Sequence, residues 1–297
     1  MAKRFGGLWP AMVTPIAADG SPALDTVERL VELFIQQGLS GLYVTGSTGQ
    51  WPLLSQSERE TVVERTIKAA AGRIPIMVHV GATTTAEAVA LARHAEKLGA
   101  DAISAVGPIY YSPTPENLFY HFRTIAAATR LPMYAYHFSP VSPSSVTASE
   151  YVRRLQEIPT VAGMKITDRD LFLFGLIRAY AGDKWTLFSG ADEVICHGIL
   201  SGADGAIGTF YNVWGAECQA AWEATKRGDL AAGTAFMRRF QPALDAVLSR
   251  GGTWSFIRSA MRIRFNIEVG MPRPPLGATD PSWDDADVQR LLEMVCG

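Results

Sequence analysis

The sequence predicts an α/β fold, a (β/α)8 TIM barrel of parallel strands with a C-terminal helical extension. Eight short apolar runs alternate with longer amphipathic segments along the 297 residues. Most of these runs are apolar throughout, as strands buried on both faces are. No glycine-rich phosphate loop follows the first run, which disfavours the competing doubly wound open sheet. We therefore predict a barrel carrying the active site over residues 1–225 and a helical extension over residues 226–297.

The predicted strands follow one another at regular spacing. They cover residues 8–15, 41–46, 74–81, 102–108, 131–137, 161–167, 185–190 and 205–210. Parallel neighbours need long crossover connections, and the amphipathic segments between the runs supply them as helices. Barrel enzymes place their active sites at the C-terminal ends of the strands, so polar residues at these ends are the functional candidates.

Capping signals mark the first helices. Asp25 opens a segment with apolar residues at helical spacing, and Gly38 follows its end. Ser57 with Glu60 resembles a capping box for the second helix, and Thr85 begins the third. These signals fall between the predicted strands, as the alternating fold requires.

The chain continues beyond the eighth unit. Residues 229–250 and 255–264 have the pattern of two further helices that a barrel does not need. Residues 270–281 are rich in proline and glycine, which predicts an extended tail on the surface before a last short helix near 284–295. These segments make up the predicted extension.

Composition limits the classes of partner and compartment. A formal net charge of -2 argues against nucleic acid, which is usually bound by a basic face. The three cysteines, Cys196, Cys218 and Cys296, show no paired spacing and favour reduced thiols in a cytoplasmic protein. Residues 1–9 lack the features of a secretory signal, and no run of eighteen apolar residues predicts a membrane span.

The histidines do not predict a metal site. None of the five, His79, His94, His121, His137 and His197, forms a ligand pair at metal-binding spacing. His79 lies within the third predicted strand and His137 at the end of the fifth. For both we expect an ordinary satisfied hydrogen bond.

Lys165 is the least expected residue, because it interrupts an apolar strand. Burial disfavours the charged ammonium, which leaves a neutral amine able to attack a ketone. The alternative is a strand-end lysine that pairs with a carboxylate or extends to water. Its position at the active-site end of a barrel strand favours the chemical role.

The turn after the second strand offers Ser47 and Thr48 between two glycines. Hydroxyls and exposed backbone amides suit the carboxylate of a small acid. The alternative is an ordinary turn in which either hydroxyl caps a helix. No lysine follows in the manner of a nucleotide-binding loop.

Three further strand ends carry candidates with structural alternatives. Tyr136 shares one strand face with Tyr134, and a phenol near a lysine can move protons, although core packing is the commoner role. Asp192 and Glu193 either bind substrate hydroxyls or occupy the first turn of a helix, where acidic side chains are favoured. Thr209 ends the eighth strand with a hydroxyl.

Together these segments resemble the N-acetylneuraminate lyase and dihydrodipicolinate synthase family of class I aldolases, over nearly the full chain. Residues 41–49 are similar to the family's carboxylate loop, in the serine-threonine form of the lyases. Residues 163–168 resemble its Schiff-base lysine segment, and Tyr136 stands where the family keeps its catalytic tyrosine. Residues 190–193 and 202–212 resemble the tail-binding and eighth-strand signatures.

The resemblance implies a cofactor-free lyase acting through a Schiff base on Lys165. It implies substrate contacts from Ser47, Thr48, Thr167, Gly190, Asp192, Glu193 and Thr209, with Tyr136 and Thr48 also taking part in catalysis. It further implies that Tyr111 serves a neighbouring subunit's site, hence a homo-oligomer, expected to be a tetramer. The implied substrate is a small keto acid, pyruvate or a sugar acid, and the implied reaction is cleavage of N-acetylneuraminate to N-acetylmannosamine and pyruvate.

Departures from the pattern bear on the substrate. The synthase branch follows its tyrosine with an arginine-bearing segment, whereas this chain continues from Tyr136 as His-Phe-Ser-Pro-Val, without arginine. Phe138 and Ser139 replace the isoleucine and proline of the lyases, and Gln50 stands where glutamate is usual. A 2-keto-3-deoxy sugar-acid aldolase or dehydratase and a pyruvate-aldehyde condensing enzyme therefore remain alternatives, as does a sensor without turnover.

Overall fold

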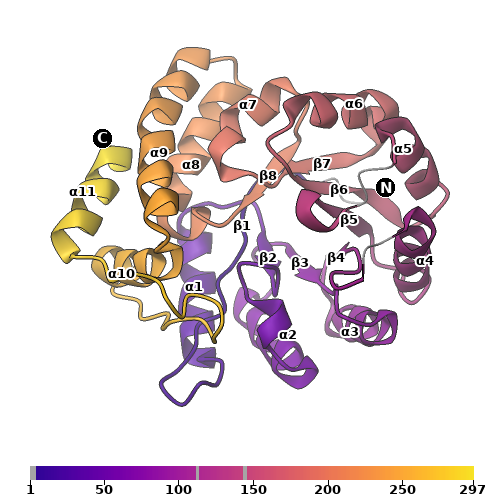
Figure 1. Cartoon of the computed structure of the whole chain (residues 1–297), viewed down its shortest axis with the longest axis horizontal. Helices are drawn as coiled ribbons and strands as arrows, with labels where there is room; N and C mark the ends of the chain where they lie inside the picture. The colour runs from indigo at the N-terminus through magenta and orange to yellow at the C-terminus, as the bar shows by residue number, and fades with distance from the viewer. Residues whose placement is uncertain (1–4, 112–113, 143–145) are drawn as a thin grey trace.

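The computed structural model describes residues 5–111, 114–142 and 146–297, and it has the predicted barrel at its centre (Figure 1). The eight strands are β1 Gly7–Pro10, β2 Leu42–Val44, β3 Ile76–His79, β4 Ala102–Val106, β5 Met133–Phe138, β6 Val161–Thr167, β7 Thr186–Ser189 and β8 Gly205–Gly208. All ladder pairings are parallel, in the order β1-β8-β7-β6-β5-β4-β3-β2. This order excludes the doubly wound sheet.

The barrel closes between β1 and β2 through a short contact. Ala11 forms a parallel bridge with Tyr43, and the Met12 amide donates to the Tyr43 carbonyl at 2.9 Å. The predicted first strand extended to residue 15, but its ladder with β8 ends at Pro10. The rest of the apolar run, including Val13, is buried without belonging to a ladder, because hydrophobicity reports burial and not pairing.

The helices between the strands form the outer ring seen in Figure 1. They are α1 Leu24–Gln36, α2 Gln56–Ala70, α3 Thr85–Leu98, α4 Pro115–Ala126, α5 Ala148–Gln156, α6 Leu171–Ala181, α7 Ile195–Leu200 and α8 Tyr211–Lys226. The predicted capping box of α2 was wrong by two residues. The Ser55 hydroxyl accepts from the Glu58 amide, and the Glu58 carboxylate accepts from the Ser55 amide at 2.8 Å.

Two apolar cores support the barrel. The larger one lies between the strands and the helices, as expected for a sheet covered by crossovers. The smaller one fills the barrel interior with side chains from several strands, including Trp9, Tyr43, Tyr134 and Phe188. Such a filled interior is a floor for the active-site end and not a channel.

The C-terminal extension consists of α9 Leu230–Arg250, α10 Thr253–Phe265 and α11 Asp285–Cys296, with a tail between the last two. These helices pack on α8 and on one another, at the side of the barrel shown in orange and yellow in Figure 1. The Arg273 guanidinium fastens the tail to the barrel by donating to the Glu58 carboxylate and to the carbonyls of Gly20 and Leu53. Among the described helices, none is both long and apolar enough to cross a membrane.

Candidate active site

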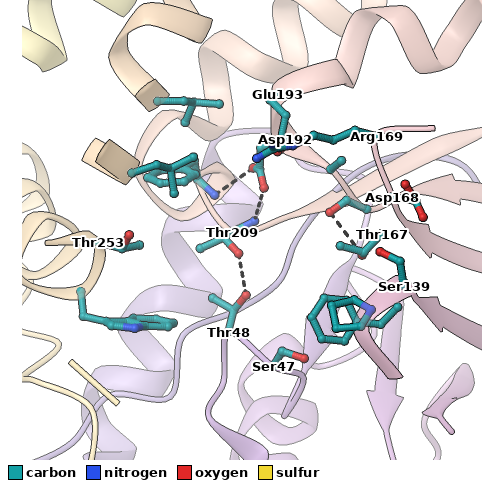
Figure 2. A pocket seen from close by; sticks show the side chains of 18 of the residues that line it. Ser47, Thr48, Ser139, Thr167, Asp168, Arg169, Asp192, Glu193, Thr209 and Thr253 are labelled. Carbon is teal, nitrogen blue, oxygen red and sulfur yellow. Dashed lines mark hydrogen bonds and ion pairs between the residues drawn. The ribbon is translucent and has the colours of Figure 1, made fainter. Parts of the chain in front are cut away.

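A cavity of about 600 Å³ opens at the C-terminal ends of the strands (Figure 2). Its lining includes seven of the residues predicted from the sequence: Ser47, Thr48, Thr167, Gly190, Asp192, Glu193 and Thr209. Thr167 is the last residue of β6, and the others follow β2, β7 and β8. The parallel barrel brings them together because all its strands end at the same rim.

Lys165 lies beneath this cavity, near the end of β6. Its side chain is only 4% exposed, and its Nζ lies 4.4 Å from the Tyr43 ring centroid and 4.2 Å from that of Tyr136. Thr167 follows two residues later on the same strand, so both side chains point to the same face. The amine therefore lies beside two aromatic rings, one strand step below the lining residue Thr167. Neither Lys165 nor Tyr136 is itself among the described cavity-lining residues.

Tyr136 stands opposite Lys165 in the ladder between β5 and β6. It is buried, and Tyr134, on the same strand face, packs in the interior core against Phe188 and Phe5. Alternation along β5 thus sends both phenols inward, as predicted. Only Tyr136 is at the level of the lysine, which leaves Tyr134 with a packing role.

The turn after β2 has the tight geometry that its sequence suggested. Thr45 adopts a left-handed conformation with φ of 53°, Ser47 is exposed, and the Thr48 hydroxyl lies 2.7 Å from that of Thr209. The next helix, α2, is capped by Ser55. The two hydroxyls are therefore not its cap and remain directed to the cavity.

Gln50 has a structural role that accounts for an amide at this position. Its Nε2 donates to the Thr14 carbonyl at 3.0 Å, and its Oε1 accepts from the Arg273 amide at 2.8 Å. The Thr14 hydroxyl in turn donates to the Gly49 carbonyl. An ionised glutamate could accept from Arg273 but could not donate to Thr14. Gln50 thus links the Ser47–Thr48 turn to the C-terminal tail.

Asp192 connects two walls of the cavity. Its carboxylate oxygens accept from the Thr209 and Phe210 amides, each at 3.0 Å. Burial raises the pKa of Asp192 to about 7, although these two amides oppose the shift. Gly208 allows this close approach, because a Cβ there would lie 2.4 Å from Asp192 Oδ1. Asp192 therefore positions Thr209 and also faces the cavity.

Glu193 lies at the rim and is paired. Arg169 donates to its carboxylate, an arginine that sequence reasoning did not single out (Figure 2). The Gln241 side chain of α9 donates to the Glu193 carbonyl at 2.8 Å. Asp192 and Glu193 belong to a single 3₁₀ turn, Asp192–Val194, which precedes α7. The extension therefore helps to hold this acidic turn.

The two strand histidines differ. His79 is fully buried and satisfied, since its Nδ1 meets the Thr45 carbonyl and its Nε2 accepts from the Val106 amide. Burial holds the pKa of His79 well below its usual value. The same expectation was wrong for His137, whose ring nitrogens have no hydrogen-bond partner among the described residues. Its Nε2 lies 3.8 Å from Asp168 Oδ2, beyond hydrogen-bond distance.

Tyr111 lies apart from the cavity within one chain. Its side chain is 79% exposed and contacts that of Tyr110, with ring centroids 5.1 Å apart. It is not among the cavity-lining residues in the described part of the chain. Tyr110 and Tyr111 thus form an exposed aromatic pair after β4. The contribution of Tyr111 to a neighbouring subunit's site stays a prediction.

The apolar wall of the cavity was not predicted from the sequence. Leu244 and Leu248 of α9, Trp254 of α10 and Leu276 of the tail face the polar strand ends. Their apolar character signalled burial but not a cavity, because core and pocket positions share one hydrophobic pattern. Within the described residues, no three His, Cys, Asp or Glu side chains gather closely enough to hold a metal ion.

Asn212 explains part of the eighth-strand signature. It is fully buried, and its amide donates to the carbonyls of Ala11 and Thr209 while its Oδ1 accepts from the Val13 amide. These bonds join the end of β8 to the chain leaving β1. Asn212 thus supports the cavity from below without lining it.

Comparisons with known proteins agree with this architecture. The Dihydrodipicolinate synthetase family matches residues 4–293. The chain is 36% identical over 286 residues to an N-acetylneuraminate lyase of Escherichia coli O1:K1, covering 95% of both chains.

Solved structures give the same result. A Ruminococcus gnavus sialic acid aldolase superposes with a TM-score of 0.88 at 27% identity, covering 98% of this chain and 97% of its own. The N-acetylneuraminate lyase of Proteus mirabilis has a TM-score of 0.88 at 29% identity, covering 99% and 98%. The extent of these matches confirms the resemblance seen in the strand-end motifs. The chain belongs to the dihydrodipicolinate synthetase family.

Proposed function

We propose that this protein is a cytoplasmic N-acetylneuraminate lyase that works through a Schiff base on Lys165 and needs no cofactor. The observation that carries the proposal is the buried amine of Lys165 beneath a cavity lined by hydroxyl and carboxyl groups. The N-acetylneuraminate lyases among its relatives support this substrate. The Ruminococcus gnavus aldolase has also been solved as a catalytic lysine mutant, which supports a lysine-dependent reaction.

The first step is attack by the neutral Lys165 amine on the C2 keto carbon of the open-chain sugar acid. Loss of water leaves an iminium ion joined to Nζ. Ser47 and Thr48 bind the substrate carboxylate beside it through their hydroxyls and the turn's amides. The Tyr43 and Tyr136 rings, whose centroids lie 4.4 Å and 4.2 Å from Nζ, hold the Lys165 side chain in place for this attack.

The second step cleaves the bond between C3 and C4. The Tyr136 hydroxyl accepts the proton of the C4 hydroxyl as it passes its own proton to the substrate carboxylate. The C3–C4 electron pair moves to the iminium, and N-acetylmannosamine departs as the aldehyde. The enamine left on Lys165 is protonated at C3, and hydrolysis frees pyruvate and the amine. Asp192, Glu193, Thr167 and Thr209 hold the hydroxylated tail during these steps.

The same proposal includes a homotetramer in which Tyr111 reaches a neighbouring subunit's cavity. Its exposure in a single chain is what supports this arrangement.

A second candidate function is cleavage of a shorter 2-keto-3-deoxy sugar acid. Two features favour it: the Asp192 oxygens already accept two amides, and Glu193 is paired with Arg169, so fewer free acceptors face a long tail.

A substrate panel tests the choice. Pyruvate release is measured with N-acetylneuraminate, 2-keto-3-deoxygluconate and related acids. A higher kcat/KM for N-acetylneuraminate supports the lyase, whereas preference for a shorter acid selects the second candidate. Release from none of them, together with tight binding of pyruvate, would make the protein a sensor.

The role of Lys165 is tested by substitution and by trapping. We expect Lys165→Ala to lower kcat by roughly a thousandfold or more, since the covalent step is lost. Borohydride with pyruvate should add one adduct to the wild type, on Lys165, and none to the variant. Lys184→Ala, at an exposed position before β7, is the matched control and should retain the adduct. An adduct that persists in Lys165→Ala would contradict the mechanism.

A further inference from the structure

Arg169 projects from the rim of the cavity with most of its guanidinium free. Its side chain is 73% exposed, and its Nε lies 2.5 Å from Glu193 Oε1. Among the described residues, neither terminal amino group of Arg169 has a hydrogen-bond partner. Figure 2 shows the side chain reaching toward Glu193 along the cavity wall. Two parallel donors thus remain available to a ligand.

The charge around Arg169 is otherwise acidic. The other charged side chains that line the cavity in the described part of the chain are Asp168, Asp192 and Glu193. A purely acidic rim would repel an anionic keto acid, and the guanidinium offsets that repulsion. Its planar fork also matches a carboxylate or phosphate in a two-point contact that hydroxyl groups do not need.

The position of Arg169 assigns it to the far end of a substrate. Lys165 lies buried at the bottom of the site, Thr167 lines the wall above it, and Arg169 follows at the exposed rim. A keto acid joined to Lys165 therefore extends its tail toward Arg169 and Glu193. Whatever group ends the tail meets this ion pair.

We propose that the preferred substrates are 2-keto-3-deoxy sugar acids with a second anionic group at the tail end, and that Arg169 selects them. The proposal rests on the Schiff-base step of the proposed function. It differs in the substrate, because it ranks N-acetylneuraminate, whose tail ends in a hydroxymethyl group, below acids with an anionic tail. A terminal carboxylate or phosphate would accept hydrogen bonds from the two free amino groups of Arg169. With a terminal hydroxymethyl group, Arg169 would keep only its ion pair with Glu193. The bonds made and broken at Lys165 are unchanged.

The test uses matched substrate pairs that differ only at the tail end. N-acetylneuraminate is compared with its 9-phosphate, and 2-keto-3-deoxygluconate with its 6-phosphate and with 2-keto-3-deoxyglucarate. We expect kcat/KM for pyruvate release to be about tenfold or more higher for the anionic member, chiefly through KM. The phosphate and carboxylate arms show which of the two anions the site prefers.

Variants assign the preference to Arg169. Arg169→Ala should bring the paired values together, and Arg169→Lys should restore part of the difference because it keeps charge without the fork. Arg153→Ala is the control, since Arg153 is a comparably exposed arginine on α5 that pairs with Glu157 outside the cavity. Arg153→Ala should keep the full preference.

The outcomes separate the two proposals. Equal kcat/KM within every pair, or a preference that survives Arg169→Ala, would overturn the role of Arg169 while leaving the Schiff-base function intact. Pyruvate from none of the acids, and no borohydride adduct, would overturn the proposed function and this inference with it.

Discussion

At the scale of residues, Asp192 shows how one side chain joins structure and chemistry. It accepts the Thr209 amide, and the Thr209 hydroxyl lies 2.7 Å from that of Thr48. Replacing Asp192 with alanine would therefore disturb both hydroxyls as well as any direct contact with a sugar tail. Tail binding and a place in the first turn of a helix were the two roles predicted for Asp192, and this amide-binding role was not among them.

The raised pKa of Asp192 predicts a particular dependence of stability on pH. The unfolded side chain ionises near 3.8, whereas the folded one, desolvated by burial, ionises near 7. Between these two pH values Asp192 is protonated in the folded state but ionised in the unfolded state. The free energy of unfolding therefore falls as pH rises through this range. In the Asp192→Asn variant the side chain at this position is an amide, which does not ionise in this pH range. We expect the free energy of unfolding of the wild type, relative to this variant, to fall as pH rises from about 4 to about 7 and to level off above that.

Denaturant unfolding at several pH values measures this difference. The variant also leaves one buried amide without its acceptor, which lowers its stability at every pH by about 1–3 kcal/mol. That constant offset does not affect the slope. A wild-type minus variant difference that stays flat from about pH 4 to about pH 7 would show that Asp192 does not titrate there.

At the scale of elements, the start of α2 is also the anchor of the C-terminal tail. Glu58 caps the helix with Ser55 and accepts from the Arg273 guanidinium, including a bond of 2.8 Å from Nη1 to Oε2. Arg273 holds the pKa of Glu58 down at about 2, with the two Ser55 hydrogen bonds acting in the same direction. The helix cap and the docking of the extension therefore share one carboxylate.

Acid should release this contact. Because the folded pKa of Glu58 lies below its ordinary value of 4.5, its contribution to stability is complete above that pH and is lost as pH falls toward 2. We expect Glu58→Gln to be less stable than the wild type at pH 7, with the difference shrinking between pH 4.5 and pH 2. Glu60→Gln, on the same helix, is the control and should show little difference.

Circular dichroism during urea unfolding at fixed pH measures both variants. Since Glu58 is only partly exposed and its partner is an arginine with several bonds, the loss at neutral pH should be about 1 kcal/mol or more. An undiminished difference at pH 2.5 would mean that the carboxylate charge is not what anchors the tail.

At the scale of the whole molecule, the predicted tetramer implies that Tyr111 of one subunit contributes to the active site of a neighbouring subunit. If Tyr111 acts in a neighbouring subunit's site, Lys165→Ala disables the site of the chain that carries it, whereas Tyr111→Phe disables the site of the neighbouring chain. Dissociating and reassembling a mixture should restore intact sites in some mixed pairs. Random pairing predicts activity of roughly a quarter of the wild type, since half of the pairs are mixed and each has one intact site.

Pyruvate release before and after reassembly is the measurement, with light scattering to establish the oligomeric state. The control is a mixture of Lys165→Ala with Tyr136→Phe, whose two lesions affect the same chain's site if Tyr136 and Lys165 act together as they lie. That mixture also leaves no site with lysine and tyrosine both intact. Recovery that is no greater for Tyr111→Phe than for the control would place Tyr111 outside the partner's site.

The sequence alone determined the barrel, its eight strands and most of the polar residues at its rim. It could do so because continuous apolar runs, strand-to-helix alternation and a lysine inside such a run are local features of the chain. The predicted extension was also recognisable from helical spacing and from the proline-rich tail. The predicted strand ends and the predicted α2 cap were wrong by a few residues. For the strands, the reason is that residues stay buried beyond the point where strand pairing ends.

Only the tertiary structure decided how distant segments meet. It placed Lys165 between Tyr43 and Tyr136, gave Asp192 its two amides, and brought Arg169 beside Glu193. It also supplied the cavity's apolar wall from the extension. Such contacts depend on which side chains the closed barrel and its extension bring within a few ångströms of one another, and no local pattern of residues encodes that distance.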